Sequence, residues 1–156
     1  MEDHSNGVAT AARDVTPASR PLLRKERRIV RSAPRRDLQV ASMPRTNVLV
    51  VGNPDATRIV VDMLRLDLRG PVVRWRAGQP LDLPSPAHAA TLVLENVTGL
   101  TTDEQFRVLR WLDEVRGRIR VVSTTSIPVW PRVQVGVFNE VLYYRLNIVF
   151  VDMEKT

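Results

Sequence analysis

Five short apolar runs alternate with helical patterns along most of this chain, and this alternation restricts the fold more than any other feature of the sequence. The runs cover residues 47–52, 71–75, 91–94, 118–124 and 147–151. Continuous apolar runs of this length are typical of strands that are buried on both faces of a sheet. Strands that alternate with helices form a parallel sheet with right-handed crossovers. The sequence therefore predicts a three-layer α/β domain with a five-stranded, mainly parallel sheet.

Three segments between these runs have helical periodicity. Residues 55–67 and 101–116 repeat apolar side chains at three- and four-residue steps, and Thr101 with Glu104 fits a capping box. A third, short helix is predicted around Phe138–Leu146.

Prolines mark the predicted loops. The segment QPLDLPSP lies before the third run, and Pro128 and Pro131 break the segment after the fourth. We expect Trp130 to be a loop side chain, and Trp75 and Trp111 to pack within a strand and a helix.

The first 45 residues differ in composition from the rest, and they are predicted to form a disordered basic leader before a body of residues 46–156. The leader holds 10 Lys+Arg and 5 Asp+Glu, whereas the remainder holds 13 and 12. One segment, Arg20–Arg36, has the pattern of a short helix ended by Pro34. Three interpretations of this segment stay open: a polybasic arm that binds nucleic acid, a segment attracted to anionic lipid, or a solvated tail.

Composition excludes several kinds of site. The chain has no cysteine, and its only histidines, His4 and His88, lie far apart in the sequence, so neither a zinc site nor a histidine-based catalytic triad is expected. No run of 18 apolar residues is present, and the N-terminus lacks the order of a secretory signal. A cytoplasmic location with no membrane contact is the expectation.

Ligands of parallel α/β sheets bind beyond the carboxyl ends of the strands, so the residues after each run are the candidate site. After the first run the chain reads GNPDATRI from Gly52. A phosphate-binding loop reads G-x-x-x-x-G-K-[ST]. Gly52 fits, but Thr57 stands at the second glycine and Arg58 at the lysine. Alone, this segment does not distinguish a phosphate loop from an ordinary strand-to-helix turn.

Several other segments carry a family resemblance. VGVFNEVLYYRLNI at 135–148 resembles G-x-F-R-x-D-L-Y-Y-R-L-N-V of the AAA+ domain of sigma-54-dependent transcriptional activators, the bacterial enhancer-binding proteins. ATLVLENV at 90–97 is similar to GTLFLDEI, QFRVLRWL at 105–112 to Q-x-K-L-L-R-V-L, and RVVSTTS at 120–126 to RVIAATN. These segments, with PVVRWRA at 71–77, occur in the family's order. The resemblance implies a P-loop-NTPase-like AAA+ fold and a role in transcription regulation.

The departures from the family pattern fall on its nucleotide-binding positions. The Walker B strand of the family ends in Asp-Glu, where this chain has Glu95 and Asn96, and the sensor asparagine is Ser126. An amide cannot accept a proton from the attacking water. With Gly52, Thr57 and Arg58 these residues form a degenerate nucleotide site. The resemblance therefore implies that ATP hydrolysis is lost, that ATP and Mg²⁺ bind weakly at most, and that the chain is not an enzyme.

Two parts of the family domain are expected to be absent. Only eleven residues lie between Ala77 and Ala89, where the family carries a long insertion with the GAFTGA loop that contacts sigma-54. A contact with sigma-54 is accordingly not expected. Because the chain reaches Thr156 directly after the fifth run, we also expect no helical lid and no DNA-binding helices.

Arg145 occupies the family's second arginine-finger position, whereas the first is Asn139. Such an arginine acts on the ATP of a neighbouring subunit. The alternative is a local ion pair of Arg145 with Glu140 or Asp152. Tyr143 and Tyr144 are expected to be packing residues.

Three hypotheses about function remain open. The first is a non-catalytic regulatory module that interacts with AAA+ activator subunits, and it is preferred on the grounds of the resemblance. The second is a residual nucleotide-binding protein without turnover. The third is a decayed gene product without a selected function.

Overall fold

The described part of the chain folds around a single parallel sheet. The computed structural model describes residues 46–65, 70–88 and 90–154. The predicted leader and its candidate helix Arg20–Arg36 lie outside these residues. Within them, five strands pair in the order β2-β3-β4-β1-β5, and every pair is parallel. The strands are β1 (Val48–Val51), β2 (Val72–Arg76), β3 (Thr91–Glu95), β4 (Arg120–Thr125) and β5 (Val149–Asp152). The five predicted runs are all confirmed as strands.

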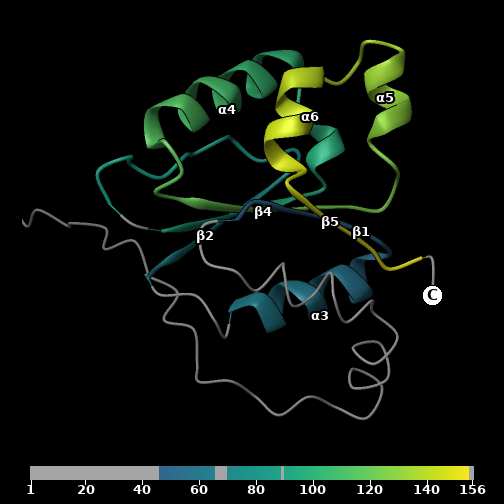
Figure 1. The fold of residues 1–156 in the computed structure, drawn as a ribbon, viewed down its shortest axis with the longest axis horizontal. Helices are drawn as coiled ribbons and strands as arrows, with labels where there is room; N and C mark the ends of the chain where they lie inside the picture. Colours follow the sequence, from purple (N-terminus) through teal and green to yellow (C-terminus); the bar gives the residue numbers. More distant parts are fainter. Residues whose placement is uncertain (1–45, 66–69, 89, 155–156) are drawn as a thin grey trace, which may run out of the picture.

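Helices cover both faces of the sheet, as Figure 1 shows, so the three-layer prediction is confirmed. On one face lie α4, α5 and α6, and on the other lies α3. The helices are α3 (Pro54–Arg65), α4 (Thr102–Val115), α5 (Trp130–Gln134) and α6 (Glu140–Leu146). A short 3-10 helix, Val97–Gly99, follows β3. The three predicted helices correspond to α3, α4 and α6. Their bounds agree within a few residues, except that the predicted end of α3 at residue 67 lies outside the described residues.

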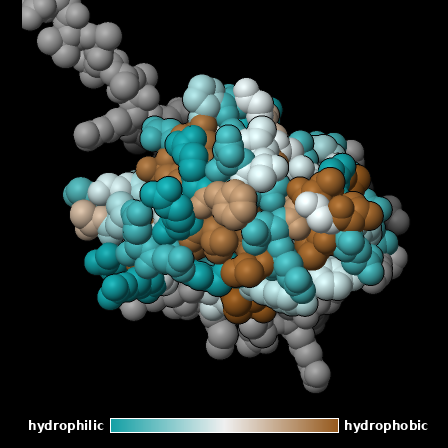
Figure 2. Space-filling view, turned by 90° about the horizontal axis from the view of Figure 1, so that it is seen from above, coloured by the Kyte–Doolittle hydropathy of each residue, from teal (hydrophilic) through white to brown (hydrophobic). Residues whose placement is uncertain are grey.

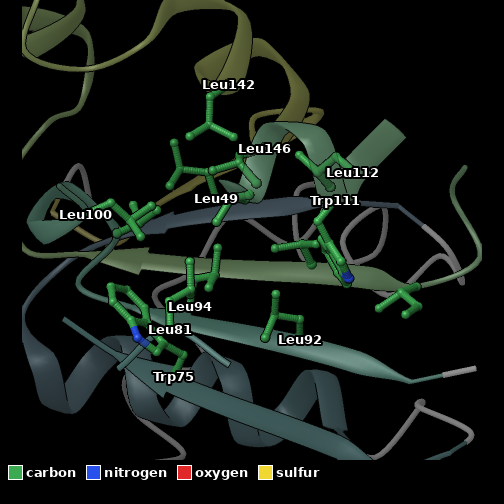
Figure 3. Packing of buried hydrophobic residues seen from close by; sticks show 14 of the residues in the cluster. Leu49, Trp75, Leu81, Leu92, Leu94, Leu100, Trp111, Leu112, Leu142 and Leu146 are labelled. Carbon is green, nitrogen blue, oxygen red and sulfur yellow. The ribbon is translucent and has the colours of Figure 1, made fainter. Parts of the chain in front are cut away.

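The core lies on both sides of the sheet and consists largely of leucine and valine. On the side of α4 and α6, the buried cluster includes Leu49, Leu92, Leu142 and both buried tryptophans (Figure 3). On the side of α3, valines from β1, β3 and β4 pack against the helix. Burial of one such side chain is worth about 1.5–3 kcal/mol. Trp75 and Trp111 are 2% and 5% exposed, which confirms that they pack in the core.

Helix α4 begins where the sequence predicts. The side chain of Thr101 accepts a hydrogen bond from the backbone N–H of Glu104, and the Glu104 carboxylate accepts one from the N–H of Thr101. This is the predicted capping box. At the other end, Arg116 adopts a left-handed conformation (φ 46°) and Gly117 follows with φ 73°, so the chain turns toward β4.

The connection from β2 to β3 packs against α4 without forming a helix in its described residues, 77–88 and 90. Leu81 is buried in the core. The indole N–H of Trp111 donates to the carbonyl of Pro84 at 2.8 Å, and Arg107 donates to the carbonyl of Leu81 at 2.9 Å. Two side chains of α4 therefore hold this short connection in place.

One prediction about the segment after β4 is wrong. The structure places a short helix, α5, where the prolines had suggested a loop, and Trp130 is its first residue. The reason is that Pro131 stands in the first turn, where a missing N–H has no intrahelical partner to lose. Trp130 contacts both Tyr143 and Tyr144, with ring centroids 5.5 and 6.2 Å apart.

Buried Gln105 joins α4 to the start of α6. Its amide nitrogen donates to the carbonyls of Leu100 and Val137, and its oxygen accepts from the N–H of Asn139 at 2.7 Å. Asn139 in turn caps α6, because its side chain accepts from the N–H of Leu142. The asparagine at the family's first arginine position thus has a capping role in this structure.

The capping box of α4 gives a prediction about stability. Thr101→Ala removes the acceptor for the Glu104 N–H, and we expect it to lower the free energy of unfolding by about 1 kcal/mol. Thr102→Ala, one residue into the helix, is the matched control and is expected to change it by less than about 0.5 kcal/mol. Urea denaturation of both variants measures the difference. Equal effects of the two substitutions would contradict a specific contribution of the cap.

Candidate functional site

The carboxyl edge of the sheet brings together six of the seven predicted site residues. Gly52 follows β1, Ser126 follows β4, and Glu95 ends β3 with Asn96 directly after it. Thr57 and Arg58 lie in the first turns of α3. Because β3, β4 and β1 are neighbours in the sheet, their carboxyl ends lie side by side.

The connection between β1 and α3 is a turn of two residues, Gly52 and Asn53. The side chain of Asn53 accepts a hydrogen bond from the N–H of Ala56 at 2.9 Å, and Pro54 is the first residue of the helix. Asparagine at the cap and proline at the first position are both favoured at a helix start. The helix therefore begins four residues before Arg58, within the stretch that a phosphate-binding loop would occupy.

The segment that follows β5 packs closely against this turn. A Cβ atom placed on Gly52 would lie 2.8 Å from the Cβ of Met153, which follows β5 and is 9% exposed. Glycine is thus required here by the close approach of Met153. Thr57 is buried, and its hydroxyl donates to the carbonyl of Pro54 at 3.1 Å. Met153 and the methyl group of Thr57 therefore both lie close to Gly52.

Glu95 is held by two arginines of the neighbouring strand. Its Oε1 lies 2.7 Å from Nη1 of Arg74, and its Oε2 lies 2.9 Å from Nε and 2.8 Å from Nη2 of Arg76. Arg74 also contacts Asp62 of α3 at 3.3 Å. The Glu95 side chain is 22% exposed. Two guanidinium groups therefore already occupy both oxygens that would bind a metal ion.

Asn96 adopts a left-handed backbone conformation (φ 56°, ψ 56°) at the end of β3. Asparagine tolerates this conformation better than glutamate does. Its side-chain oxygen accepts from the hydroxyl of Thr98, whose oxygen lies 3.3 Å from that of Thr125. Ser126 and Arg58 are exposed, and Arg58 has only a long contact of 3.9 Å with Asp55.

Arg145 lies at the opposite edge of the sheet from these residues. Its carbonyl accepts from the side chain of Asn47, which directly precedes β1. Its guanidinium forms an ion pair with Asp113 of α4, with Nη1 2.7 Å from Oδ1. Arg145 therefore forms a local ion pair, as in the alternative interpretation, but its partner is Asp113 and not Glu140 or Asp152. Arg145 is thus too far from the carboxyl edge to act within its own subunit.

The described residues add two negative findings. They contain no group of three or more side chains placed to hold a metal ion. They also include no helix with the length and apolar character that a bilayer span requires.

Comparison with known proteins fits this geometry. The model of the sigma-54 interaction domain matches residues 30–155. The chain belongs to this family. The match begins inside the segment predicted as the leader, so the boundary between leader and body stays a prediction. The order of the strands in the sheet agrees with an AAA+ domain of the sigma-54 activator type. So does the family resemblance of the sequence segments that lie between residues 71 and 148.

One curated relative of this domain is a transcription regulator by name. The DNA-binding transcriptional regulator NtrC of Rhizobium meliloti is 32% identical over 74 residues, which cover 40% of this chain and 15% of that protein. NtrX from Brucella abortus, solved in complex with ADP, has a TM-score of 0.64 at 18% identity, covering 76% of this chain and 35% of NtrX. The P-loop NTPase domain of a sigma-54 transport activator from E. coli has a TM-score of 0.53 at 21% identity, covering 70% of this chain and 98% of that domain. The chain thus spans a minor part of NtrC and NtrX.

Sequence reasoning missed four residues that shape this site. Asn53 had a detectable signal, because Asn-Pro-Asp before an apolar pattern is a helix-start signature. Arg74 and Arg76 are two residues apart on β2, so their side chains lie on the same face of the sheet. Only the pairing register of β2 with β3 shows that Glu95 lies beside them. Met153 gave no signal in the sequence.

The ion pairs of Glu95 with Arg74 and Arg76 give a prediction about stability, with the exposed Arg58 as the control. Glu95→Gln removes both charged contacts, and we expect a loss of about 1–2 kcal/mol in the free energy of unfolding. Arg58→Gln removes an exposed, long contact and is expected to cost less than about 0.5 kcal/mol. Chemical denaturation at low salt measures both. A neutral Glu95→Gln would show that the pair contributes nothing to stability, and that Glu95 is available to other ligands.

Proposed function

We propose that this protein is a non-catalytic member of its family, a pseudo-ATPase that acts in transcription control through protein interaction. The observation that carries the proposal is the two-residue turn between β1 and α3. A phosphate loop cradles phosphates with free backbone N–H groups. In this turn, Asn53 caps the helix and Met153 lies against Gly52. The shortness of this turn and the close approach of Met153 support the proposal that it does not hold a nucleotide phosphate.

Three further residues support the loss of turnover. Glu95 would have to leave Arg74 and Arg76 to bind Mg²⁺, and Asn96 cannot act as a base toward water. Arg58 stands where the family has lysine, and its side chain lies exposed on α3 beside Asp55. Without these groups the developing charge on a transferred phosphoryl group has no stabilising partner.

The interaction partner that best fits the chain is a catalytically intact AAA+ activator subunit in the cytoplasm. Membership of the family supports this partner, although fold alone does not determine function. Arg145 keeps the finger-like position and lies 39% exposed at the edge away from the degenerate site. The short β2–β3 connection, held against α4, takes the place of the sigma-54-contacting loop, so the proposed role does not include a contact with sigma-54.

The first prediction of this proposal concerns nucleotide. The full chain is expected to show no Mg²⁺-dependent ATP hydrolysis above the protein-free rate. The variant Thr57→Gly, Arg58→Lys, Asn96→Glu restores the motif letters but leaves the turn at two residues. We therefore expect it to gain at most weak binding and no turnover, measured by phosphate release and by titration with a fluorescent ATP analogue.

A result against this prediction is easily recognised. Mg²⁺-dependent hydrolysis by the natural chain that disappears in Asn96→Ala would show a working site. Saturable ATP binding without hydrolysis would instead support a residual nucleotide-binding protein.

The second prediction concerns Arg145 and its ion pair with Asp113. If Arg145 reaches the ATP of a neighbouring subunit, the protein should stimulate the ATPase rate of a sigma-54 activator from the same cell. An arginine acting in trans is worth on the order of 10³–10⁵ in rate. Arg145→Ala should abolish the stimulation, whereas Asp113→Asn, which releases the guanidinium, should preserve or increase it.

Arg132→Ala, which removes an arginine of α5, is the matched control and should leave the stimulation unchanged. Thermal melts of all three variants monitor folding, since the ion pair also joins α6 to α4. Inhibition that survives Arg145→Ala would mean that the protein acts by occupying a subunit position. Neither co-sedimentation nor any rate change with the activator would refute the interaction proposal.

A further inference from the structure

Three aromatic side chains meet at the surface where α5 lies beside α6. The ring centroids of Trp130 and Tyr143 are 5.5 Å apart, those of Trp130 and Tyr144 are 6.2 Å apart, and those of Tyr143 and Tyr144 are 5.3 Å apart. Trp130 is nevertheless 39% exposed and Tyr144 is 54% exposed. Packing within the domain therefore uses only part of this cluster, and the remainder faces solvent.

An apolar side chain and a carboxylate lie next to the rings. Glu140 and Val141 precede Tyr144 on α6 by four and three residues, so the three side chains share one side of the helix. Val141 is 56% exposed, and within the described part of the chain no residue bonds or pairs with the Glu140 carboxylate. Together with Trp130 and Tyr143, these residues form the aromatic face. Figure 2 looks onto this layer of helices and shows hydrophobic patches between hydrophilic side chains.

The arginines of the two helices leave the aromatic face to another cation. Arg145 forms its ion pair with Asp113 of α4. Arg132 follows Trp130 by two residues in α5, and residues at this spacing lie on different sides of a helix. Aromatic rings attract guanidinium groups, and a carboxylate binds them through charge-assisted hydrogen bonds. The chemistry of the face is therefore that of a site for arginine with apolar neighbours.

We propose that the aromatic face binds residues 20–28 of the same chain, whose sequence is RPLLRKERR. This segment of the leader contains five basic residues and a single acid, and Leu22 and Leu23 stand among them. In the bound form one arginine stacks on the rings and another pairs with Glu140, while the leucines cover Val141. The segment lies outside the described residues and before the first residue of the family match, so the contact belongs to this chain and not to its family.

The connection between this segment and the domain favours it over an arginine-rich segment of another protein. The side chain of Asn47 donates to the carbonyl of Arg145, so the chain enters the domain beside the end of α6. Helix α6 is only about 10 Å long, whereas residues 29–45 can span about 55 Å when extended. A tether of this length makes the binding intramolecular, with an effective concentration on the order of millimolar. The inference is independent of the proposed function, since it requires neither a nucleotide nor an activator subunit.

The fluorescence of Trp130 tests the contact, because Trp75 and Trp111 are buried. In the full natural chain, acrylamide should quench Trp130 weakly. Replacing all five basic residues of the segment by glutamine should release the segment, increase the quenching constant and shift the emission to longer wavelength. The variant carries the substitutions R20Q, R24Q, K25Q, R27Q and R28Q. Trp130→Phe measures the background from the two buried indoles.

A titration then measures which side chains bind the segment. The glutamine variant of the full chain is titrated with a synthetic peptide of residues 18–30, and the emission of Trp130 reports binding. Adding Tyr144→Ala should raise the dissociation constant about two- to fivefold. Adding Glu140→Gln should raise it about twofold or more and reduce its dependence on salt. Glu114→Gln, at an exposed acid of α4, is the matched control and should leave the constant unchanged, and circular dichroism shows whether all variants are folded.

Three results would overturn the proposal. One is equal quenching of Trp130 in the natural chain and in the glutamine variant. Another is a peptide with glutamine at the five basic positions that binds as tightly as the natural peptide, since cations would then contribute nothing. The third is a protection of Trp130 that increases with protein concentration, which would assign the segment to the aromatic face of a second copy.

Discussion

The burial of β1 is the constraint on which the rest of this fold depends. Its four residues are between 0% and 5% exposed, with β4 on one side and β5 on the other. Asn47, just before it, accepts from the N–H groups of Val121 and Val149 and donates to the carbonyl of Arg145. One side chain and one carbonyl thus fix the amino ends of β4, β5 and α6 relative to β1. Every candidate residue takes its place from this alignment.

Much of the fold follows from the sequence because the strands are short continuous apolar runs and α4 has a complete start signal. The five strands, α4 with its capping box, and the last helix were all predictable from periodicity and caps. Helix α5 was not, since five residues are too few for a periodic pattern and two prolines nearby favour a loop. Its first residue, Trp130, contacts the tyrosines of α6, and no pattern within the helix itself indicates these contacts.

The position of the candidate site was predictable from the sequence, but the side chains that surround it were not. The rule that ligands bind at carboxyl ends of parallel strands led to the segment after Gly52, and the family resemblance identified Glu95, Asn96 and Ser126. What surrounds them depends on strand register and on segments distant in sequence. The arginines beside Glu95 come from β2, and the methionine beside Gly52 follows β5. Likewise, Asp113 is 32 residues from Arg145, so a search among near neighbours could not find it.

The order of strands in the sheet has a consequence for synthesis on the ribosome. Val48 emerges early, yet its partners Val122 and Val149 follow only after most of the domain has been translated. Until then the apolar β1 has no neighbour on either side, and contacts between distant segments form slowly. A nascent chain of this kind exposes an apolar strand until its partners have been translated. We therefore expect the yield of folded protein in the cell to depend on chaperones that hold the β1 segment.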